Sequence, residues 1–125
     1  MPAPILLVED DDSIREMMVM LLDLEGFTVV PVTDGADALA YLRGGGAAKV
    51  ILLDLMTPHM DGWAFRREQR DDPSIADIPV IVLSACDTDS DGLDAAASFR
   101  KPVDLAKVIG AVRRIGSDDC QKITS

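Results

Sequence analysis

Several apolar runs in this chain end on residues that can do chemistry. The first run ends on Glu9 and Asp10, a later one on Asp54, and two more on Ser84 and Lys101. A carboxylate at the end of a buried strand costs desolvation free energy, so it needs a partner or a function. Carboxylates that converge raise one another's pKa unless a cation lies between them. Acids, a hydroxyl and an amine together can hold a divalent cation beside a phosphoryl group.

The donor atoms at these ends favour Mg²⁺ as the cation. Neither Cys nor His stands there, and carboxylate oxygens with water completing the shell describe Mg²⁺ better than zinc. His59 follows in an acidic loop, which is more typical of a solvated side chain than of a base. The segment Asp87–Gly92 copies the first half of a calcium loop, but Ser98 stands where a bidentate Glu belongs. We expect an acidic loop there.

Alternating strands and helices must position these residues. Short apolar runs predict strands buried on both faces, and apolar spacing of three and four residues predicts helices between them. A polar, frayed tail is expected after Gly116. We predict strands at 4–10, 27–32, 48–54, 78–84 and 98–102, and helices from 13, at 36–43, after 62 and at 105–115.

The first helix has the clearest signals. Ser13 and Glu16 have capping-box spacing, and Gly26 provides a stop. The predicted buried face of this helix comprises Ile14, Met17, Met18, Leu21 and Leu22.

This alternation predicts an α/β fold with a doubly wound, five-stranded parallel sheet. Parallel neighbours need right-handed crossover connections, which place helices on both faces. We expect a flavodoxin-like (βα)5 arrangement with strand order 2-1-3-4-5 and one domain over residues 1–116, followed by a tail at 117–125. Ligands bind at the carboxyl ends of the strands where the order reverses. Strands one and three would therefore bring Glu9, Asp10 and Asp54 together.

Composition narrows the classes of function. The chain has 125 residues, 48% of them hydrophobic, which suits one domain with one core. Twelve Lys and Arg against 22 Asp and Glu give a net charge of −10, which argues against direct nucleic-acid binding. No long apolar segment or signal peptide is evident, so we expect a cytoplasmic protein without membrane insertion. Cys86 and Cys120 are expected to be free thiols.

Four motifs in this order resemble the receiver domain of two-component response regulators: "LLVEDD", "VILLDLMTPHMDG", "VIVLSA" and "FRKP", within residues 5–115. The resemblance implies that Asp54 accepts a phosphoryl group from a histidine kinase or histidine phosphotransfer protein, and that the chain is not an enzyme acting on a separate substrate. It implies that Glu9, Asp10, Asp54 and the backbone carbonyl of Met56 hold Mg²⁺. Ser84 would bond to a phosphoryl oxygen, and Lys101 would pair with the phosphoryl group.

The chain also departs from the family. Ser84 and Lys101 are only 17 residues apart, so a shortened or irregular fourth helix is expected between them. Ser98 stands where receivers commonly carry an aromatic residue, with Phe99 one place later. Met56 is apolar and cannot orient water, which predicts a long-lived phosphoryl state with slow self-dephosphorylation.

Other functions use similar sheets. A flavin mononucleotide binder needs a hydroxyl-rich loop after the first strand, where this chain has acids, and a haloacid-dehalogenase-type phosphatase needs an acid at Met56. The alternative that stays open is a receiver-like module that docks a protein without phosphorylation. The favoured reading is a stand-alone regulator that signals to a downstream protein through a protein-binding surface.

Overall fold

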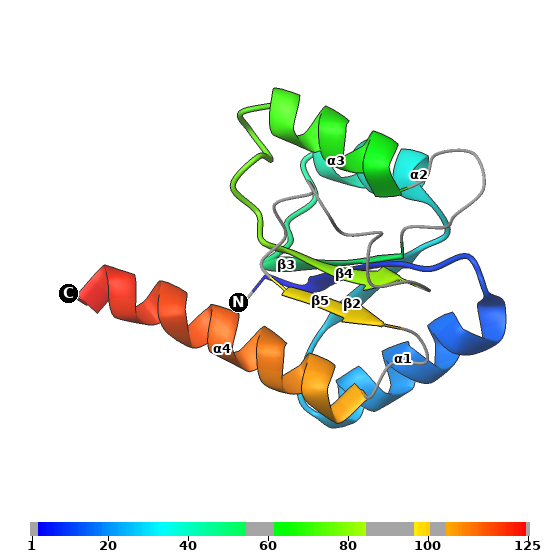
Figure 1. The fold of residues 1–125 in the computed structure, drawn as a ribbon, viewed down its shortest axis with the longest axis vertical. Helices are drawn as coiled ribbons and strands as arrows, with labels where there is room; N and C mark the ends of the chain where they lie inside the picture. Colours follow the sequence, from blue (N-terminus) through cyan, green and yellow to red (C-terminus); the bar gives the residue numbers. More distant parts are fainter. Residues whose placement is uncertain (1–2, 55–61, 85–96, 101–104, 125) are drawn as a thin grey trace.

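The computed structural model of the chain describes residues 3–54, 62–84, 97–100 and 105–124 (Figure 1). Strands and helices alternate through most of these residues, as the apolar spacing predicted. The strands are β1 (Ile5–Val8), β2 (Val29–Val32), β3 (Val50–Asp54), β4 (Val80–Ser84) and β5 (Ala97–Arg100). The helices are α1 (Asp12–Leu24), α2 (Gly35–Arg43), α3 (Gly62–Asp71) and α4 (Leu105–Thr124).

The five strands form one parallel sheet with the order β2-β1-β3-β4-β5. The predicted fold class and strand order are therefore confirmed. In the register, Val8 of β1 lies beside Leu53 of β3, and Asp54 lies beside Leu83 of β4. The carboxyl ends of β1, β3 and β4 consequently meet at one edge of the sheet.

Helices cover both faces of the sheet (Figure 1). Successive strand residues point to opposite faces, so β1, β3 and β4 each contribute to two separate apolar cores. The core under α2 and α3 contains Leu6, Val8, Ala38, Leu39, Leu42, Ile51, Leu53, Phe65, Ile75, Val80 and Val82. The core under α1 and α4 contains Ile5, Leu7, Met18, Leu22, Val50, Leu52, Ile81, Leu83, Val108, Ala111 and Val112.

Helix α1 begins one residue earlier than predicted, and its cap differs. Asp11 is the N-cap and accepts a hydrogen bond from the Ile14 amide at 2.9 Å, so the predicted capping box of Ser13 and Glu16 is wrong. Asp11 takes this position because its extended backbone aims the carboxylate at the free amides of the first turn. The predicted stop is confirmed, since Gly26 has φ +92° and its amide bonds to the Asp23 carbonyl.

The buried face of α1 is narrower than predicted. Met18 and Leu22 are buried, whereas Ile14 is 37% and Met17 46% exposed. The expected burial of Ile14 and Met17 is therefore wrong. The sheet contacts one narrow stripe of the helix, so apolar residues on its flanks remain in contact with solvent.

Helix α4 is longer than predicted. The frayed tail expected after Gly116 is instead helical through Thr124, and this half of α4 extends away from the sheet (Figure 1). Val108 and Val112, two residues of the predicted buried face, are buried. The predicted irregular fourth helix lies at 85–96, outside the described residues, and the domain boundary at residue 116 stays a prediction.

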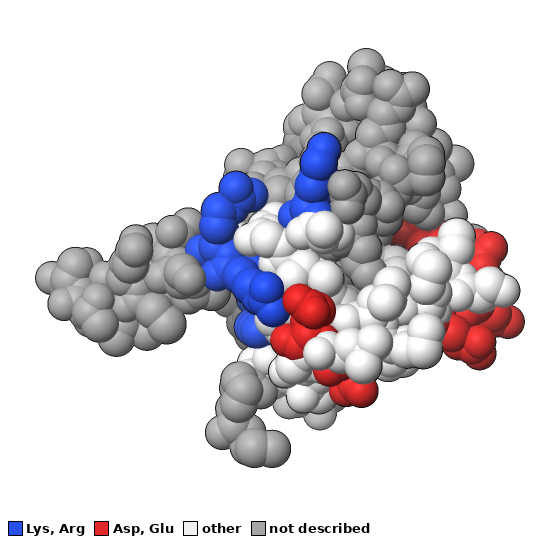
Figure 2. Space-filling view, turned by 90° about the horizontal axis from the view of Figure 1, so that it is seen from below, with Lys and Arg blue, Asp and Glu red and all other residues white. Residues whose placement is uncertain are grey.

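Basic and acidic side chains are unevenly distributed over the surface. On the face in Figure 2, Lys and Arg side chains gather to one side, with acidic groups next to them and further acidic groups at the opposite side. Arg113 pairs with Glu25 at 3.1 Å, and Arg113 and Lys49 both lie against the ring of Phe27. Within the described ranges, no helix has the length and apolar character needed to cross a bilayer.

Candidate functional site

Three acidic side chains converge at the carboxyl edge of the sheet. Glu9 and Asp10 directly follow β1, and Asp54 is the last residue of β3. Each offers one carboxylate oxygen, and these oxygens all lie within 4.8 Å of one another. Glu9 is 1% and Asp54 2% exposed, whereas Asp10 is exposed. The convergence that the strand order predicted is therefore present in the structure.

The β1–β3 register explains this convergence. Because Val8 lies beside Leu53, the next residues along the two strands are Glu9 and Asp54. The Glu9 amide also donates to the carbonyl of Val32 in β2 at 3.1 Å, so the chain continues parallel to β2 before it turns into α1. Glu9 and Asp54 each make further interactions in the structure. The site thus lies at the carboxyl ends of the neighbouring strands β1 and β3.

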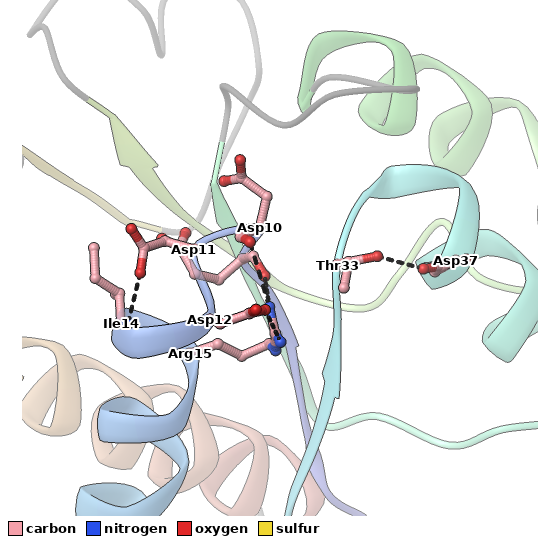
Figure 3. Close-up of polar contacts among 8 residues, drawn as sticks. Asp10, Asp11, Asp12, Ile14, Arg15, Thr33 and Asp37 are labelled. Atoms are coloured by element: carbon pink, nitrogen blue, oxygen red, sulfur yellow. Dashed lines mark hydrogen bonds and ion pairs between the residues drawn. The ribbon is translucent and has the colours of Figure 1, made fainter.

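Other acids at this edge are engaged in capping and pairing, as Figure 3 shows. Asp11 caps α1, and Asp12 pairs with Arg15. On the neighbouring helix, the Asp37 carboxylate accepts the Thr33 hydroxyl at 2.6 Å. These contacts distinguish the acids that stabilise helix ends from the converging group of Glu9, Asp10 and Asp54.

Sequence reasoning missed one residue beside this group. Arg15, in the first turns of α1, donates from Nη1 to the carbonyl of Glu9 at 3.0 Å and, more weakly, to that of Asp10 at 3.5 Å (Figure 3). Its side chain is 17% exposed. A basic residue one helical turn after a run of four acids is the signal that would have pointed to it.

The remaining predicted site residues are only partly placed. Ser84 is the last residue of β4, directly after the residue that lies beside Asp54, so its backbone belongs to the same edge. Met56 and Lys101 lie outside the described residues. Their predicted roles, and that of the Ser84 hydroxyl, stay predictions. The segment 87–92, His59 and Cys86 are also outside the described part.

The converging acids fit a hard divalent cation. Oxygen is the only donor type in the group, which contains no sulfur or imidazole ligand. The carboxylates of Glu9 and Asp54 are buried, whereas Asp10 is exposed and can contact water. Mg²⁺ prefers this combination, because it binds few protein oxygens and retains several waters.

Comparison with known proteins agrees with this geometry. The chain is 36% identical over 126 residues to the sensory transduction protein RegX3 of Mycobacterium tuberculosis, a match that covers 94% of the chain and 54% of that protein. It is 37% identical over 116 residues to the transcriptional regulatory protein CseB of Streptomyces coelicolor, covering 89% and 48%. The chain therefore spans about half the length of these curated relatives.

Solved structures with the same fold include a receiver domain and a response regulator. The signal receiver domain of a signal transduction histidine kinase from Syntrophus aciditrophicus superposes with a TM-score of 0.87 at 27% identity, covering 94% of this chain and 92% of that one. The chemotaxis response regulator CheY4 of Vibrio cholerae gives 0.81 at 25% identity, with 92% and 99% covered. Residues 5–113 match the response regulator receiver domain family, so the chain belongs to the receiver domains of two-component response regulators.

Proposed function

We propose that this receiver domain accepts a phosphoryl group on Asp54 in a Mg²⁺-dependent reaction. The observation that carries the proposal is the convergence of Glu9, Asp10 and Asp54 within 4.8 Å, in a chain that belongs to the receiver family. The donor would be a histidine kinase or a histidine phosphotransfer protein. The domain acts as a phosphoacceptor and not as an enzyme on a separate substrate.

Asp54 is suited to act as the nucleophile. One carboxylate oxygen attacks the phosphorus of a phosphohistidine, the phosphorus–nitrogen bond breaks, and the imidazole nitrogen keeps the electron pair. Asp54 is the last residue of a central strand and 2% exposed, so its position is fixed before the donor arrives. The bound Mg²⁺ would supply positive charge against the equatorial oxygens of the phosphoryl group.

The other predicted residues complete this proposal. Glu9 and Asp10 hold the cation together with Asp54 and the backbone carbonyl of Met56. Lys101 pairs with the phosphoryl group, and the Ser84 hydroxyl bonds to one of its oxygens. Modification of Asp54 then changes a protein-binding surface that a downstream protein recognises. The stand-alone role, the cytoplasmic location and the long phosphoryl lifetime stay predictions from the sequence.

Labelling with a small phosphodonor tests the proposal. The protein is incubated with acetyl phosphate and Mg²⁺, and intact mass spectrometry should find an adduct of about 80 Da. The adduct should be absent from an Asp54→Asn variant and from a sample treated with EDTA. Asp77→Asn, which changes an exposed acid outside the site, should still be labelled.

Two results would overturn the proposal. One is the absence of any adduct under donor excess with Mg²⁺ present. The other is an adduct that persists in Asp54→Asn, because the phosphoryl group would then lie elsewhere. A chain that cannot be labelled but still binds a partner would support the alternative of a docking module.

A further inference from the structure

Arg15 contacts the backbone that carries two of the converging acids. Its Nη1 donates to the carbonyl oxygen of Glu9 at 3.0 Å and approaches that of Asp10 at 3.5 Å. Its second terminal nitrogen pairs with the carboxylate of Asp12. In Figure 3 the guanidinium approaches these carbonyls from the α1 side, and the Asp10 side chain points away from that helix. Arg15 therefore contacts the main chain of the site and not its carboxylates.

The connection between β1 and α1 is short and held at several points. The Glu9 amide bonds to Val32 of β2 at 3.1 Å, which fixes the entry to the turn. Asp11 fixes the exit, since its carboxylate caps α1 and its carbonyl accepts the Arg15 amide at 2.8 Å. Between these anchors, the carbonyls of Glu9 and Asp10 receive the Arg15 guanidinium. Arg15 thus contacts the backbone of this turn between its two anchors.

We propose that Arg15 is a positioning residue for the cation site. By holding the carbonyls of Glu9 and Asp10 toward α1, it directs their side chains toward Asp54. The inference rests on the proposed function, since it assumes that these three acids bind Mg²⁺. It adds a residue that contacts neither the cation nor the phosphoryl group.

The positive charge of Arg15 should weaken Mg²⁺ binding, whereas its positioning role should strengthen it. The direction in which the Mg²⁺ affinity changes in an Arg15 variant therefore tests the inference. A guanidinium near the site repels Mg²⁺, and Asp12, with a side chain 80% exposed, would lose its basic partner if Arg15 were removed. Both electrostatic effects predict tighter Mg²⁺ binding in a variant that lacks the guanidinium. Loss of positioning predicts weaker binding. Partners that orient metal ligands typically change metal affinity by about 10- to 100-fold when they are mutated.

Calorimetric titration with Mg²⁺ provides the measurement. We expect Arg15→Gln to bind Mg²⁺ about tenfold more weakly than the unchanged protein. Arg15→Lys keeps the charge but lacks the planar guanidinium that contacts two carbonyls and a carboxylate at once. The Mg²⁺ affinity of this variant should therefore also fall. Arg113→Gln is the matched control, because Arg113 pairs with Glu25 at the other end of α1. Its Mg²⁺ affinity should be unchanged.

Urea unfolding of the same variants in EDTA separates positioning from general stability. A merely structural role would lower the unfolding midpoint of the Arg15 variants and leave the Mg²⁺ affinity of the folded protein unchanged. Equal or tighter Mg²⁺ binding in both Arg15→Gln and Arg15→Lys would overturn the inference and leave the proposed function intact. If Arg15→Gln did not fold, the Lys variant would decide. Failure of the unchanged protein to bind Mg²⁺ would refute the proposed function, and this inference with it.

Discussion

Replacing Asp54 by Asn should stabilise the protein when no Mg²⁺ is present. The substitution keeps the shape of the side chain and removes one of two buried carboxyl groups, since Glu9 is 1% and Asp54 2% exposed. Their ligand oxygens lie within 4.8 Å of each other. At that separation, two like charges repel by about 3.5 kcal/mol with an effective dielectric constant of about 20.

The net gain should be smaller than this repulsion. Glu9 and Asp54 both make further interactions, and the substitution should weaken any in which the Asp54 carboxylate accepts a hydrogen bond. We therefore expect the free energy of unfolding in EDTA to rise by about 1–3 kcal/mol. Mg²⁺ should reduce this difference in stability. Bound to the folded state at about 100 times its dissociation constant, it stabilises the unchanged protein by about 2.7 kcal/mol, and the Asn variant should gain less.

Urea unfolding followed by circular dichroism measures both effects. Each protein is unfolded in EDTA and in excess Mg²⁺, with Asp77→Asn as the control for loss of a negative charge elsewhere. Asp77 is exposed in the connection between α3 and β4, so this variant should stay within about 0.5 kcal/mol of the unchanged protein. The reasoning is refuted if Asp54→Asn is less stable than the unchanged protein in EDTA. It is also refuted if both proteins gain equally from Mg²⁺.

Three further predictions concern the surrounding fold. Gln69 is fully buried, donates to the carbonyls of Ile75 and Ile78 and accepts from Arg66. Gln69→Leu should therefore lower the free energy of unfolding, measured by urea titration, by about 2–4 kcal/mol. The control Arg67→Leu, at an exposed position, should change it little. A Cβ on Gly46 would lie 2.4 Å from the Tyr41 ring, so Gly46→Ala should lower the melting temperature, while Gly110→Ala, in open space within α4, should raise it. Hydrogen bonds from the Ser74 hydroxyl and amide lower the pKa of Asp72 below its usual 3.8. Asp72 therefore stabilises the fold above that pH, and this contribution is lost as the pH falls through the lowered pKa. In Ser74→Ala, the carboxyl chemical shift of Asp72 should report a higher pKa.

The sequence specified the sheet and the acidic group well, because both depend on features that span a whole element. A continuous apolar run that stops at a carboxylate identifies a buried strand and its end, and Asp54 is indeed the last residue of β3. The glycines after Arg43 marked the end of α2 in the same way. Parallel topology then brought Glu9 and Asp10 beside Asp54 without any local sequence signal.

Local choices were harder to predict, because several residues could satisfy the same role. Asp11, Asp12 and Ser13 can all cap a helix, and only the backbone angles decide that Asp11 does so. The exposure of Ile14 depends on how closely α1 packs on the sheet, which its spacing does not specify. Arg15 was missed for a related reason: the run of four acids before it is a sequence signal for a basic partner, but that run does not show that Arg15 also donates to the backbone carbonyls of Glu9 and Asp10.

The acids at the strand ends also explain how the register of the central strands is specified. β1 and β3 are buried on both faces, so their apolar side chains do not alternate with polar ones. A shift of β3 by two residues would keep every side chain on its own face, and apolar burial alone would not exclude it.

Charge excludes both shifted registers. In one direction Asp54 would lie beside the buried Leu7, and in the other Glu9 would lie beside the buried Leu52. Burying a carboxylate without a polar partner costs several kcal/mol, about as much as the total stability of a marginal domain. The observed register is the one that places Glu9 and Asp54 together at an edge where Asp10 reaches solvent. The residues that we propose bind Mg²⁺ therefore also specify how the strands that carry them are paired.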